Sequence, residues 1–388
     1  MPIIYNLRHL LVRKVSTILT ALGIAMVVFI FTSMLAFVQG FRGALATTGR
    51  RDNAIVLRAG ATTEIESYVT REDAAMIRGL PEVAHDAAGQ PLATSDLVVV
   101  ISRPKRGAPE APANVTVRGV SAAAFAVRPS VRVVEGRSFA PGLSEVIVGK
   151  SLARRIADTN VGDRIRFAGR EWNVVGIFEA GGSAYESEIW GDAELLIPAF
   201  DWLGFQSVTL RLADPGAFAA FQQRLEKDPQ LEVQVVREPD YFTRQSRQVV
   251  SLLRTLSVFI GIVMSVGAVF GALNTMYAAV GSRTREIGTL LALGFSPGAV
   301  LRSFLVESLC IAGLGGGVGV LLALVASHGR STGTTNWQSF SELTFRVDVT
   351  PGVIAAGLVF AVLMGVAGGL WPARRAARLR VVDAIRSV

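Results

Sequence analysis

Residues 274–308 read NTMYAAVGSRTREIGTLLALGFSPGAVLRSFLVES, and this stretch decides how the chain is organised. It lies between two long apolar runs and carries a cluster of charges at Arg283, Arg285 and Glu286. A helical pattern follows the cluster and stops at Gly294, because glycine and the Ser-Pro pair after it favour a turn. We interpret the stretch as a loop between two membrane helices that forms a docking surface on one side of the bilayer.

Composition places the chain among membrane proteins. Hydrophobic residues make up 51% of the 388 residues and charged residues only 18%, whereas soluble domains are about one quarter charged. The net charge of +8 is not gathered in a basic helix or an aromatic-lined patch, so we expect no nucleic-acid partner. Cys310 is the single cysteine, which excludes a disulfide within the chain.

Four runs without charged residues are long enough to cross a membrane, since about 20 apolar residues span a bilayer core. They predict transmembrane helices at 16–38 and at about 255–280, 308–327 and 350–372. Residues 1–15 are basic, with apolar positions at helical spacing, which is typical of an amphipathic cytoplasmic segment on the membrane surface. A signal peptide is the alternative for the first run, but its apolar part would cover only about 7–15 residues.

Residues 39–250 differ from the rest because they hold most of the charge. Short strand-like runs, such as 145–148 and 172–178, alternate with turn signals and with helical patches such as 71–78. We therefore predict a large α+β extracytoplasmic domain, inserted between the first and second transmembrane helices.

The orientation of the chain follows from the arginines in its short flanking segments. The N-terminal segment, the loop 281–303 and the tail 373–388 are rich in arginine, and with four spans they share one side of the membrane. The positive-inside rule makes that side the cytoplasm, so we expect both chain ends there. The short polar connection His328–Asp348 is then extracytoplasmic, like the large domain.

The predicted spans contain no Asp, Glu, Lys or Arg, although ion-coupled carriers usually need such groups at mid-depth. Small residues four apart predict faces for close helix packing instead. These residues are Gly267 and Gly271, Gly313 and Gly317, Gly315 and Gly319, and Gly365 and Gly369. The alternative is that they only reflect the general glycine richness of membrane helices.

The sequence carries no motif for catalysis or metal binding. Residues 149–151 (Gly-Lys-Ser) resemble the end of a phosphate-binding loop, but Ser144 stands where that loop needs glycine, so we expect an ordinary strand-to-helix turn. Glu186 and Glu188 would share one solvated face if they lay on a strand. The three histidines are scattered and lack metal-ligand spacing. We therefore predict no catalytic residue, no metal site and no cofactor in this chain.

Three segments resemble a known family. The run NTM followed by RTREIG, ALGFS and FLVE resembles the core of the FtsX-type permease domain of MacB-like (type VII) ABC transporters. The tail WPARRAARLRVVDAIR resembles the end of that domain, with Val381 and Asp383 in place of the usual proline and glutamate. The segment EVIVGKSLARR, followed by VGDRIRFAGREWNVVGIF, resembles the MacB-like periplasmic core domain. The resemblance implies a permease subunit without a fused ATPase, with an FtsX-like domain over 251–388.

In this family two permease chains pair as a homodimer or heterodimer, and each binds a cytoplasmic ATPase subunit that holds ATP and Mg. The resemblance implies a coupling helix at Ser296–Leu301, preceded by the segment 283–294, with Ser296 as its cap. The predicted ATPase-coupling residues are Arg283, Arg285, Glu286, Gly294, Ser296, Pro297, Val300, Leu301 and Arg302. Their arginines would pair with acidic groups of the ATPase; the alternative is that they only fix the topology.

The family relays closure of the paired chains to the periplasmic domains, which is called mechanotransmission, and does not usually pass substrate through a membrane channel. The resemblance implies an export complex in a bacterial inner (plasma) membrane, with membrane lipid, a periplasmic adaptor and an outer-membrane channel as further partners. The alternative is a transmembrane regulator of the same superfamily, which activates cell-wall hydrolases or relays a signal without transport.

Overall fold

The structure is a computed structural model that describes residues 14–336 and 341–381. These residues fall into two compact units. The helical unit comprises the described chain up to Gln39, Leu252–Arg330 and the described chain from Val347. The sheet unit comprises Gly40–Ser251 and Ser331–Arg346. Most of the predicted amphipathic segment 1–15 lies outside the described residues.

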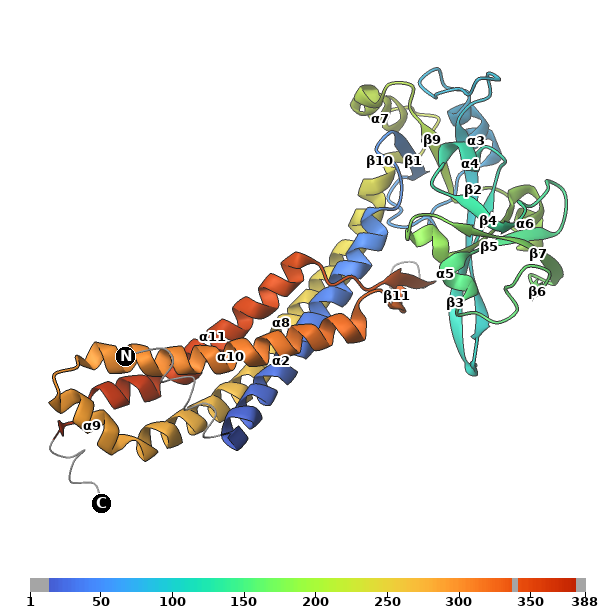
Figure 1. Ribbon diagram of the computed structural model, residues 1–388. Helices are drawn as coiled ribbons and strands as arrows, with labels where there is room; N and C mark the ends of the chain where they lie inside the picture. Colours follow the sequence, from blue (N-terminus) through green and yellow to red (C-terminus); the bar gives the residue numbers. More distant parts are fainter. Residues whose placement is uncertain (1–13, 337–340, 382–388) are drawn as a thin grey trace. The chain divides into compact units, whose positions relative to one another are not determined.

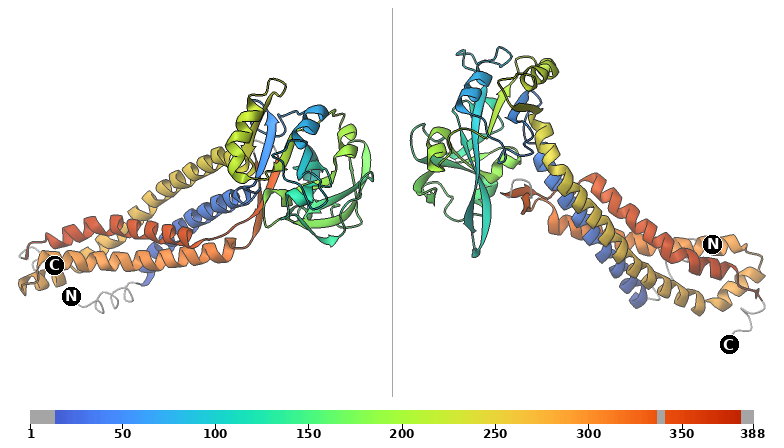
Figure 2. Two further views of the ribbon diagram at one scale, coloured as in Figure 1. Left: turned by 90° about the horizontal axis from the view of Figure 1, so that it is seen from above. Right: turned by 180° about the vertical axis from the view of Figure 1, so that it is seen from behind.

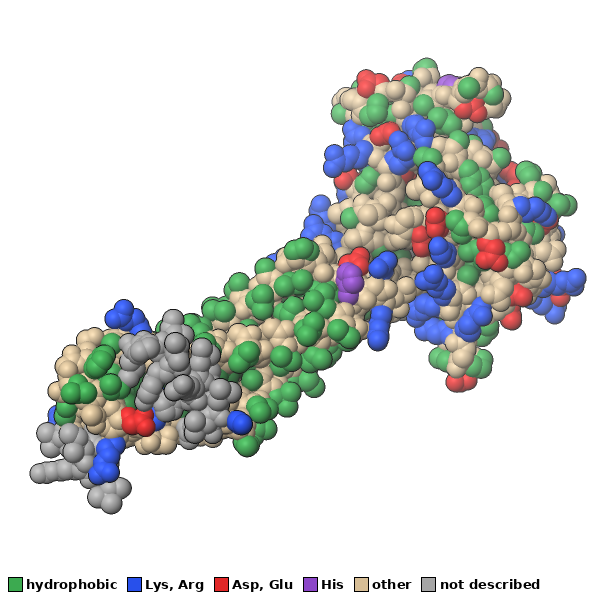
Figure 3. Space-filling view, viewed as in Figure 1, with side chains coloured by type: hydrophobic (Ala, Val, Ile, Leu, Met, Phe, Trp, Pro, Cys, Tyr) green, Lys and Arg blue, Asp and Glu red, His purple; other side chains and the backbone are tan. Residues whose placement is uncertain are grey.

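Four helices of the described chain are long and apolar enough to cross a membrane. They are α2 (Lys14–Ala46), α8 (Glu238–Ser282), α10 (Pro297–Ser327) and α11 (Pro351–Ala377), and the short α9 (Thr284–Ala292) follows α8. Hydrophobic side chains cover the long helices, whereas charged side chains gather over the sheet unit (Figure 3). The prediction of four membrane helices, with a large α+β domain between the first and the second, is confirmed (Figure 1).

Small residues set the packing of the helical unit. α10 and α11 run side by side in every view (Figures 1 and 2). Residues of α2, α10 and α11, among them Val28, Ala312 and Ala361, form a buried apolar cluster. Gly315 and Gly319 let α10 approach α2, because an added Cβ would lie 2.6 and 2.5 Å from backbone oxygens of α2.

The described strands of the sheet unit form a ten-stranded mixed sheet and a two-stranded hairpin. The order in the large sheet is β10-β1-β9-β2-β3-β8-β5-β7-β4, with β6 beside β7. Its strands are β1 (Asn53–Arg58), β2 (Ala93–Lys105), β3 (Ala108–Val120), β4 (Arg132–Gly136), β5 (Glu145–Gly149), β6 (Arg164–Phe167), β7 (Arg170–Glu179), β8 (Glu188–Asp192), β9 (Ser207–Arg211) and β10 (Val233–Arg237). The short helices are α3 (Arg71–Arg78), α4 (Ala124–Val127), α5 (Lys150–Ala153), η1 (Ala184–Ser187), α6 (Ala193–Ala199), η2 (Pro215–Ala217) and α7 (Phe218–Glu226).

Strand β2 joins the two halves of the large sheet because it changes partner along its length. Residues Ala93–Asp96 pair with β9, and the pairing with β3 begins at Leu97. Valine and other apolar side chains from both halves, including Val56, Val117 and Val148, share one buried core. Asp96 therefore lies at the point where the two halves meet.

The described parts of the connection between α10 and α11 form two strands, which the predicted polar link did not include. They form a hairpin of β11 (Ser331–Asn336) and β12 (Ser341–Arg346) that belongs to the sheet unit. The Glu342 carboxylate pairs with Lys105 at 3.1 Å and also with Arg155. The Phe345 ring meets the Phe41 ring edge-on, with 5.7 Å between centroids. These contacts fix the hairpin to the sheet unit.

Candidate functional site

The predicted coupling stretch forms the end of α8, α9, a turn and the start of α10. Gly294 has φ +89, a left-handed conformation that glycine adopts without strain. Ser296 caps α10, since its Oγ accepts a hydrogen bond from the Ala299 N–H at 3.3 Å, and Pro297 occupies the first turn. The short helix predicted at Ser296–Leu301 is thus not separate but the beginning of α10.

The turn between α9 and α10 exposes two large apolar side chains. Leu293 is 72% exposed and Phe295 is 41% exposed, and neither was selected by sequence reasoning, which looked for an amphipathic helix. Arg285, Glu286 and Arg302 are also exposed on the helices beside the turn. An exposed apolar tip with charged neighbours is typical of a surface that binds another protein.

Two of the predicted coupling residues, Arg283 and Val300, are instead buried in the helical unit. Arg283 is 7% exposed, and its Nη1 donates to the Glu307 carboxylate at 3.0 Å. Its guanidinium also lies 6.0 Å from the centroid of the Phe304 ring. Val300 is 1% exposed and belongs to a buried apolar cluster with Ile287 and Ala373, and Leu301 is half-buried against that cluster. A direct contact of Arg283 or Val300 with an ATPase stays a prediction, which this burial does not favour.

Some of the predicted packing glycines lie close to a neighbouring helix and some do not, and Gly315 and Gly319 lie close to α2 as described above. Gly365 and Gly369 bring α11 close to α10, since an added Cβ would lie 2.5 Å from the Cβ atoms of Ala312 and Ser308. The Ser308 hydroxyl also donates to the Gly365 carbonyl at 2.6 Å. At four of the predicted glycines, no described atom of a neighbouring element lies within 4 Å of an added Cβ: Gly267, Gly271, Gly313 and Gly317. Close packing at those four stays a prediction.

In the sheet unit, charged side chains are buried where β2 changes partner. We call them the ionic network: Glu64, Asp96, Arg118, Arg128, Glu188 and Glu238, each at most 7% exposed. Four carboxylates and two guanidinium groups give the network a formal charge of −2. Burying charges costs free energy unless they are paired and hydrogen-bonded, so the geometry of the pairs decides whether the network is stable.

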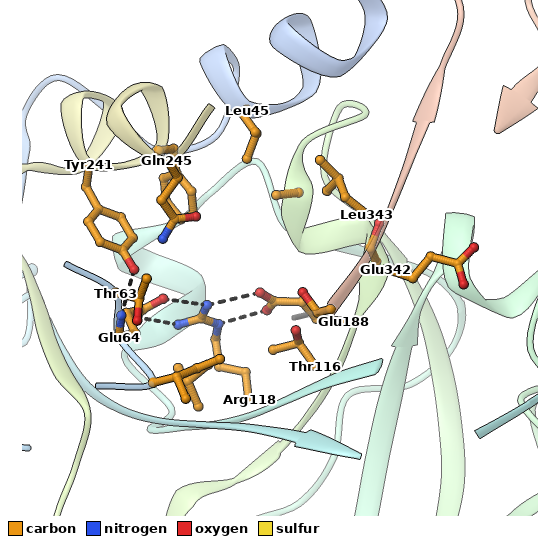
Figure 4. Close-up of a pocket in the computed structure, with 16 residues that line it drawn as sticks. Leu45, Thr63, Glu64, Thr116, Arg118, Glu188, Tyr241, Gln245, Glu342 and Leu343 are labelled. Atoms are coloured by element: carbon orange, nitrogen blue, oxygen red, sulfur yellow. Dashed lines mark hydrogen bonds and ion pairs between the residues drawn. The ribbon is translucent and has the colours of Figure 1, made fainter. Parts of the chain in front are cut away.

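Arg118 of β3 lies between two carboxylates, as Figure 4 shows. Its Nη1 and Nη2 donate to Glu64 at 2.9 and 3.0 Å, and its Nε and Nη2 donate to Glu188 at 2.8 and 3.0 Å. Nη1 also reaches Asp96 at 3.1 Å. Burial alone would lower the pKa of Arg118, but Glu188 and Glu64 raise this pKa well above its ordinary value. Arg118 is therefore a fixed cation with two bidentate partners.

Arg128 connects Asp96 to the first residue of α8. Its Nη2 donates to Asp96 at 2.7 Å and its Nε donates to Glu238 at 3.2 Å. Glu238 also accepts a hydrogen bond from the Tyr185 hydroxyl at 2.6 Å. Burial would raise the pKa of Asp96, but Arg128 and Arg118 hold that pKa below its ordinary value. Asp96 is thus an ionised bridge between two arginines.

A cavity beside the network is lined in part by Thr116, Tyr241, Gln245 and Leu343 (Figure 4). Its volume is about 40 Å³. One water needs about 10–15 Å³, so the cavity has room for a few waters. Pockets for drug-sized ligands measure about 300–1,000 Å³. This cavity is much smaller, so we interpret the ionic network as a structural element and not as a binding site for a drug-sized ligand.

Two further sequence interpretations are decided by the structure. Glu186 and Glu188 are both 7% exposed, so the prediction of a shared solvated face is wrong. They lie in different elements, η1 and β8, and Glu186 accepts hydrogen bonds from the N–H groups of Ala180 and Gly182 at 2.8 and 2.7 Å. Residues 149–151 do form a strand-to-helix turn, from β5 into α5, as predicted.

Models of two known protein families match this chain, one over the first membrane helix and most of the sheet unit and the other over the remaining membrane helices. A model of the MacB-like periplasmic core domain matches residues 17–228, and a model of the FtsX-like permease C-terminal region matches residues 258–381. The chain belongs to the MacB/FtsX family of ABC transporter permeases. It is therefore a multi-pass membrane protein with a periplasmic domain, and the sheet unit corresponds to that domain.

Two sequence relatives and one solved structure are similar to this chain to different degrees. The macrolide export ATP-binding/permease protein MacB of Burkholderia thailandensis is 29% identical over 70% of this chain and 43% of its own. The uncharacterized ABC transporter permease YknZ of Bacillus subtilis is 24% identical over the full length of both chains. The crystal structure of the periplasmic region of MacB from Actinobacillus actinomycetemcomitans is 11% identical, covers 50% of this chain and 91% of that chain, and has a TM-score of 0.37. The chain thus spans less than half the length of the MacB relative.

Proposed function

We propose that this chain is the non-catalytic permease subunit of an ABC export complex, and that a separate cytoplasmic ATPase subunit binds Mg and ATP. Two permease chains pair, and closure of the ATPase subunits moves the periplasmic domains, which act on substrate from the periplasmic side with an adaptor. The observation that carries the proposal is the exposed apolar turn between α9 and α10, in a chain of this permease family.

The turn has the chemistry of a docking surface for a folded partner. Burying an apolar side chain of the size of Leu293 or Phe295 contributes about 1.5–3 kcal/mol, and a few such residues dominate the binding energy of an interface. Arg285 and Arg302 lie beside them on exposed helix surface. These cations favour a partner with acidic groups around an apolar groove, because charge complementarity selects the partner and speeds association.

The test is affinity purification of the tagged full chain from native membranes in mild detergent, followed by mass spectrometry. The double variant Leu293→Asp/Phe295→Asp should lose the ATPase. The matched control Leu203→Asp changes a 79% exposed leucine of the sheet unit and should keep it. An ATPase that stays bound to the double variant would overturn the docking assignment. An ATPase that comes with a peptidoglycan hydrolase and no adaptor would favour the regulator over the exporter.

The proposal includes a cytoplasmic location for both chain ends and for the α9–α10 turn. Cys310 is the single cysteine, so a Cys310→Ser background allows one new cysteine at a time. In cells with a permeabilised outer membrane, an impermeant maleimide should label Leu203→Cys at once. It should label Leu293→Cys only after the inner membrane is broken. The reverse pattern would contradict the orientation.

A further inference from the structure

The 3₁₀ helix η1 (Ala184–Ser187) contacts all three segments of the sheet unit that continue into the helical unit. These segments are the residues that follow α2, the first turns of α8, and the hairpin β11–β12. Every contact described below lies within the sheet unit.

The two ends of η1 bind the segment after α2 and the hairpin. The Ala184 N–H donates to the Thr48 hydroxyl oxygen at 2.9 Å. At the other end, the Ser187 hydroxyl accepts a hydrogen bond from the Thr344 N–H at 2.9 Å and donates to the Thr344 carbonyl at 3.3 Å. Thr48 and Ser187 are 0% and 4% exposed, so water does not compete at these side chains.

The middle of η1 binds the start of α8. The Tyr185 hydroxyl donates to the Glu238 carboxylate at 2.6 Å, and the Tyr185 ring meets the Phe242 ring edge-on at 5.6 Å. Glu238 also accepts a hydrogen bond from the Arg50 N–H at 2.9 Å, which ties the segment after α2 to the same carboxylate. Hydrogen bonds to a buried carboxylate are short and strong, so Glu238 holds the start of α8 against both η1 and the segment after α2.

η1 is also fixed to the body of the sheet. Glu186 accepts a hydrogen bond from the Ser151 hydroxyl of α5 at 2.9 Å, in addition to the two N–H groups of its own loop. A Cβ on Gly149 would lie 2.2 Å from the Glu186 carbonyl oxygen, so the turn after β5 lies directly against η1. Strand β8 begins at Glu188, the residue after η1. η1 is thus attached to β5, α5 and β8.

We propose that η1 is the positioning element that passes motion of the membrane helices into the periplasmic sheet, with Tyr185 and Ser187 as its relay residues. The inference rests on the proposed function, because it needs an ATP-driven movement to relay. The physical reason is that α2, α8 and the hairpin are far apart in the sequence, yet the described segments that continue from them all contact the four consecutive residues of η1.

The test uses the full chain with its ATPase in lipid nanodiscs and measures amide hydrogen exchange with and without ADP–vanadate. In the wild type, trapping should change exchange in the α9–α10 turn and in β8. In Tyr185→Phe/Ser187→Ala the change in the turn should remain, while the change in β8 should fall by half or more. The matched control is Tyr68→Phe/Ser95→Ala, which removes the hydroxyl of a 37% exposed tyrosine and a buried serine hydroxyl that has no partner in the described residues.

The outcomes separate the two proposals. A wild type without any nucleotide-dependent change would overturn the proposed function. A relay variant with a wild-type change in β8 would overturn the role of η1 and leave the proposed function standing. Ser187→Thr keeps the hydroxyl and should behave as wild type, whereas a merely structural role would lower the thermal midpoint of Ser187→Ala without uncoupling β8. If Tyr185→Phe does not fold, Ser187→Ala alone decides the question.

Discussion

Replacing Arg118 by methionine should destabilise the sheet unit far more than the loss of a surface arginine. Methionine is apolar and unbranched, but the substitution removes the five hydrogen bonds that the guanidinium donates to Glu64, Asp96 and Glu188. Asp96 keeps Arg128 as a partner. Glu64 and Glu188 keep only neutral donors, the Ser207 hydroxyl and the Trp190 indole, among the side-chain partners described. Two buried carboxylates thus lose their cation.

The expected size of the effect follows from this geometry. Breaking one buried ion pair by removing a partner costs about 3–5 kcal/mol, out of a total domain stability of about 5–15 kcal/mol. In a domain of about 150–250 residues, 1 kcal/mol shifts the thermal midpoint by about 2–4 °C. Arg118→Met should therefore lower the thermal midpoint by about 6–20 °C if the loss of one ion pair dominates. The midpoint should fall further if the losses of the Glu64 and Glu188 pairs add.

The assay is thermal unfolding of the full chain in detergent micelles at neutral pH, followed by tryptophan fluorescence. Trp172 and Trp190 are buried in the sheet unit and report on it, and a Trp371→Phe background removes the signal of the tryptophan in α11. Arg164→Met is the matched control, since the Arg164–Glu171 pair is 73% and 61% exposed at its side chains and exposed pairs contribute at most about 1 kcal/mol. Equal midpoints for the two variants would refute the reasoning. Arg118→Lys should fall between them, because lysine keeps the charge but not the planar fork.

Three further predictions concern other parts of the molecule. The pKa of Asp96 is lowered in the folded state, so the stability that its ionised carboxylate contributes is present at neutral pH and is lost as the pH falls through that pKa. The thermal midpoint measured against pH should fall in acid, and Asp96→Asn should make this pH dependence weaker. Arg283→Glu and Glu307→Arg should each cost about 3–5 kcal/mol, and the double exchange should recover part of the loss. Both residues lie in the helical unit, so the measurement is thermal unfolding followed by far-UV circular dichroism. Gly365→Val should lower the midpoint of the helical unit, whereas Gly313→Val should not, because of these two glycines only Gly365 has a neighbouring helix within 4 Å of an added Cβ. Equal effects of the two substitutions would contradict the assigned packing.

The sequence is sufficient to predict the membrane helices, since charge-free apolar runs of about 20 residues match the thickness of a bilayer core. It does not predict where α8 begins. Residues 238–254 of α8 carry Glu238 and several arginines, so hydropathy alone does not separate this helical extension from the soluble domain. The same limit applies to α10, where Glu307 interrupts the apolar pattern although the helix is continuous.

Strand β8 and the hairpin are missed for a different reason. β8 reads Glu-Ile-Trp-Gly-Asp, and acidic residues at both ends with an internal glycine favour a turn in the absence of partners. In the structure Glu188 is neutralised by Arg118, which lies 70 positions earlier on a strand parallel to β8. β11 is rich in serine, threonine and glycine, and its pairing depends on contacts of β12 with the sheet unit. Such partners become known only from the tertiary structure.

The arginines show most clearly what the sequence cannot decide. Arg283 and Arg285 lie two residues apart in the same charged cluster, and both were predicted to meet the ATPase. The structure buries Arg283, which lies between α8 and α9, against Glu307, and it exposes Arg285 on the first turn of α9. Arg118 and Arg128 likewise lie in the domain with most of the surface charge, but they hold its interior together. A count of arginines in this loop therefore overstates its exposed charge, and Arg285 and Arg302 are the exposed cations beside the α9–α10 turn.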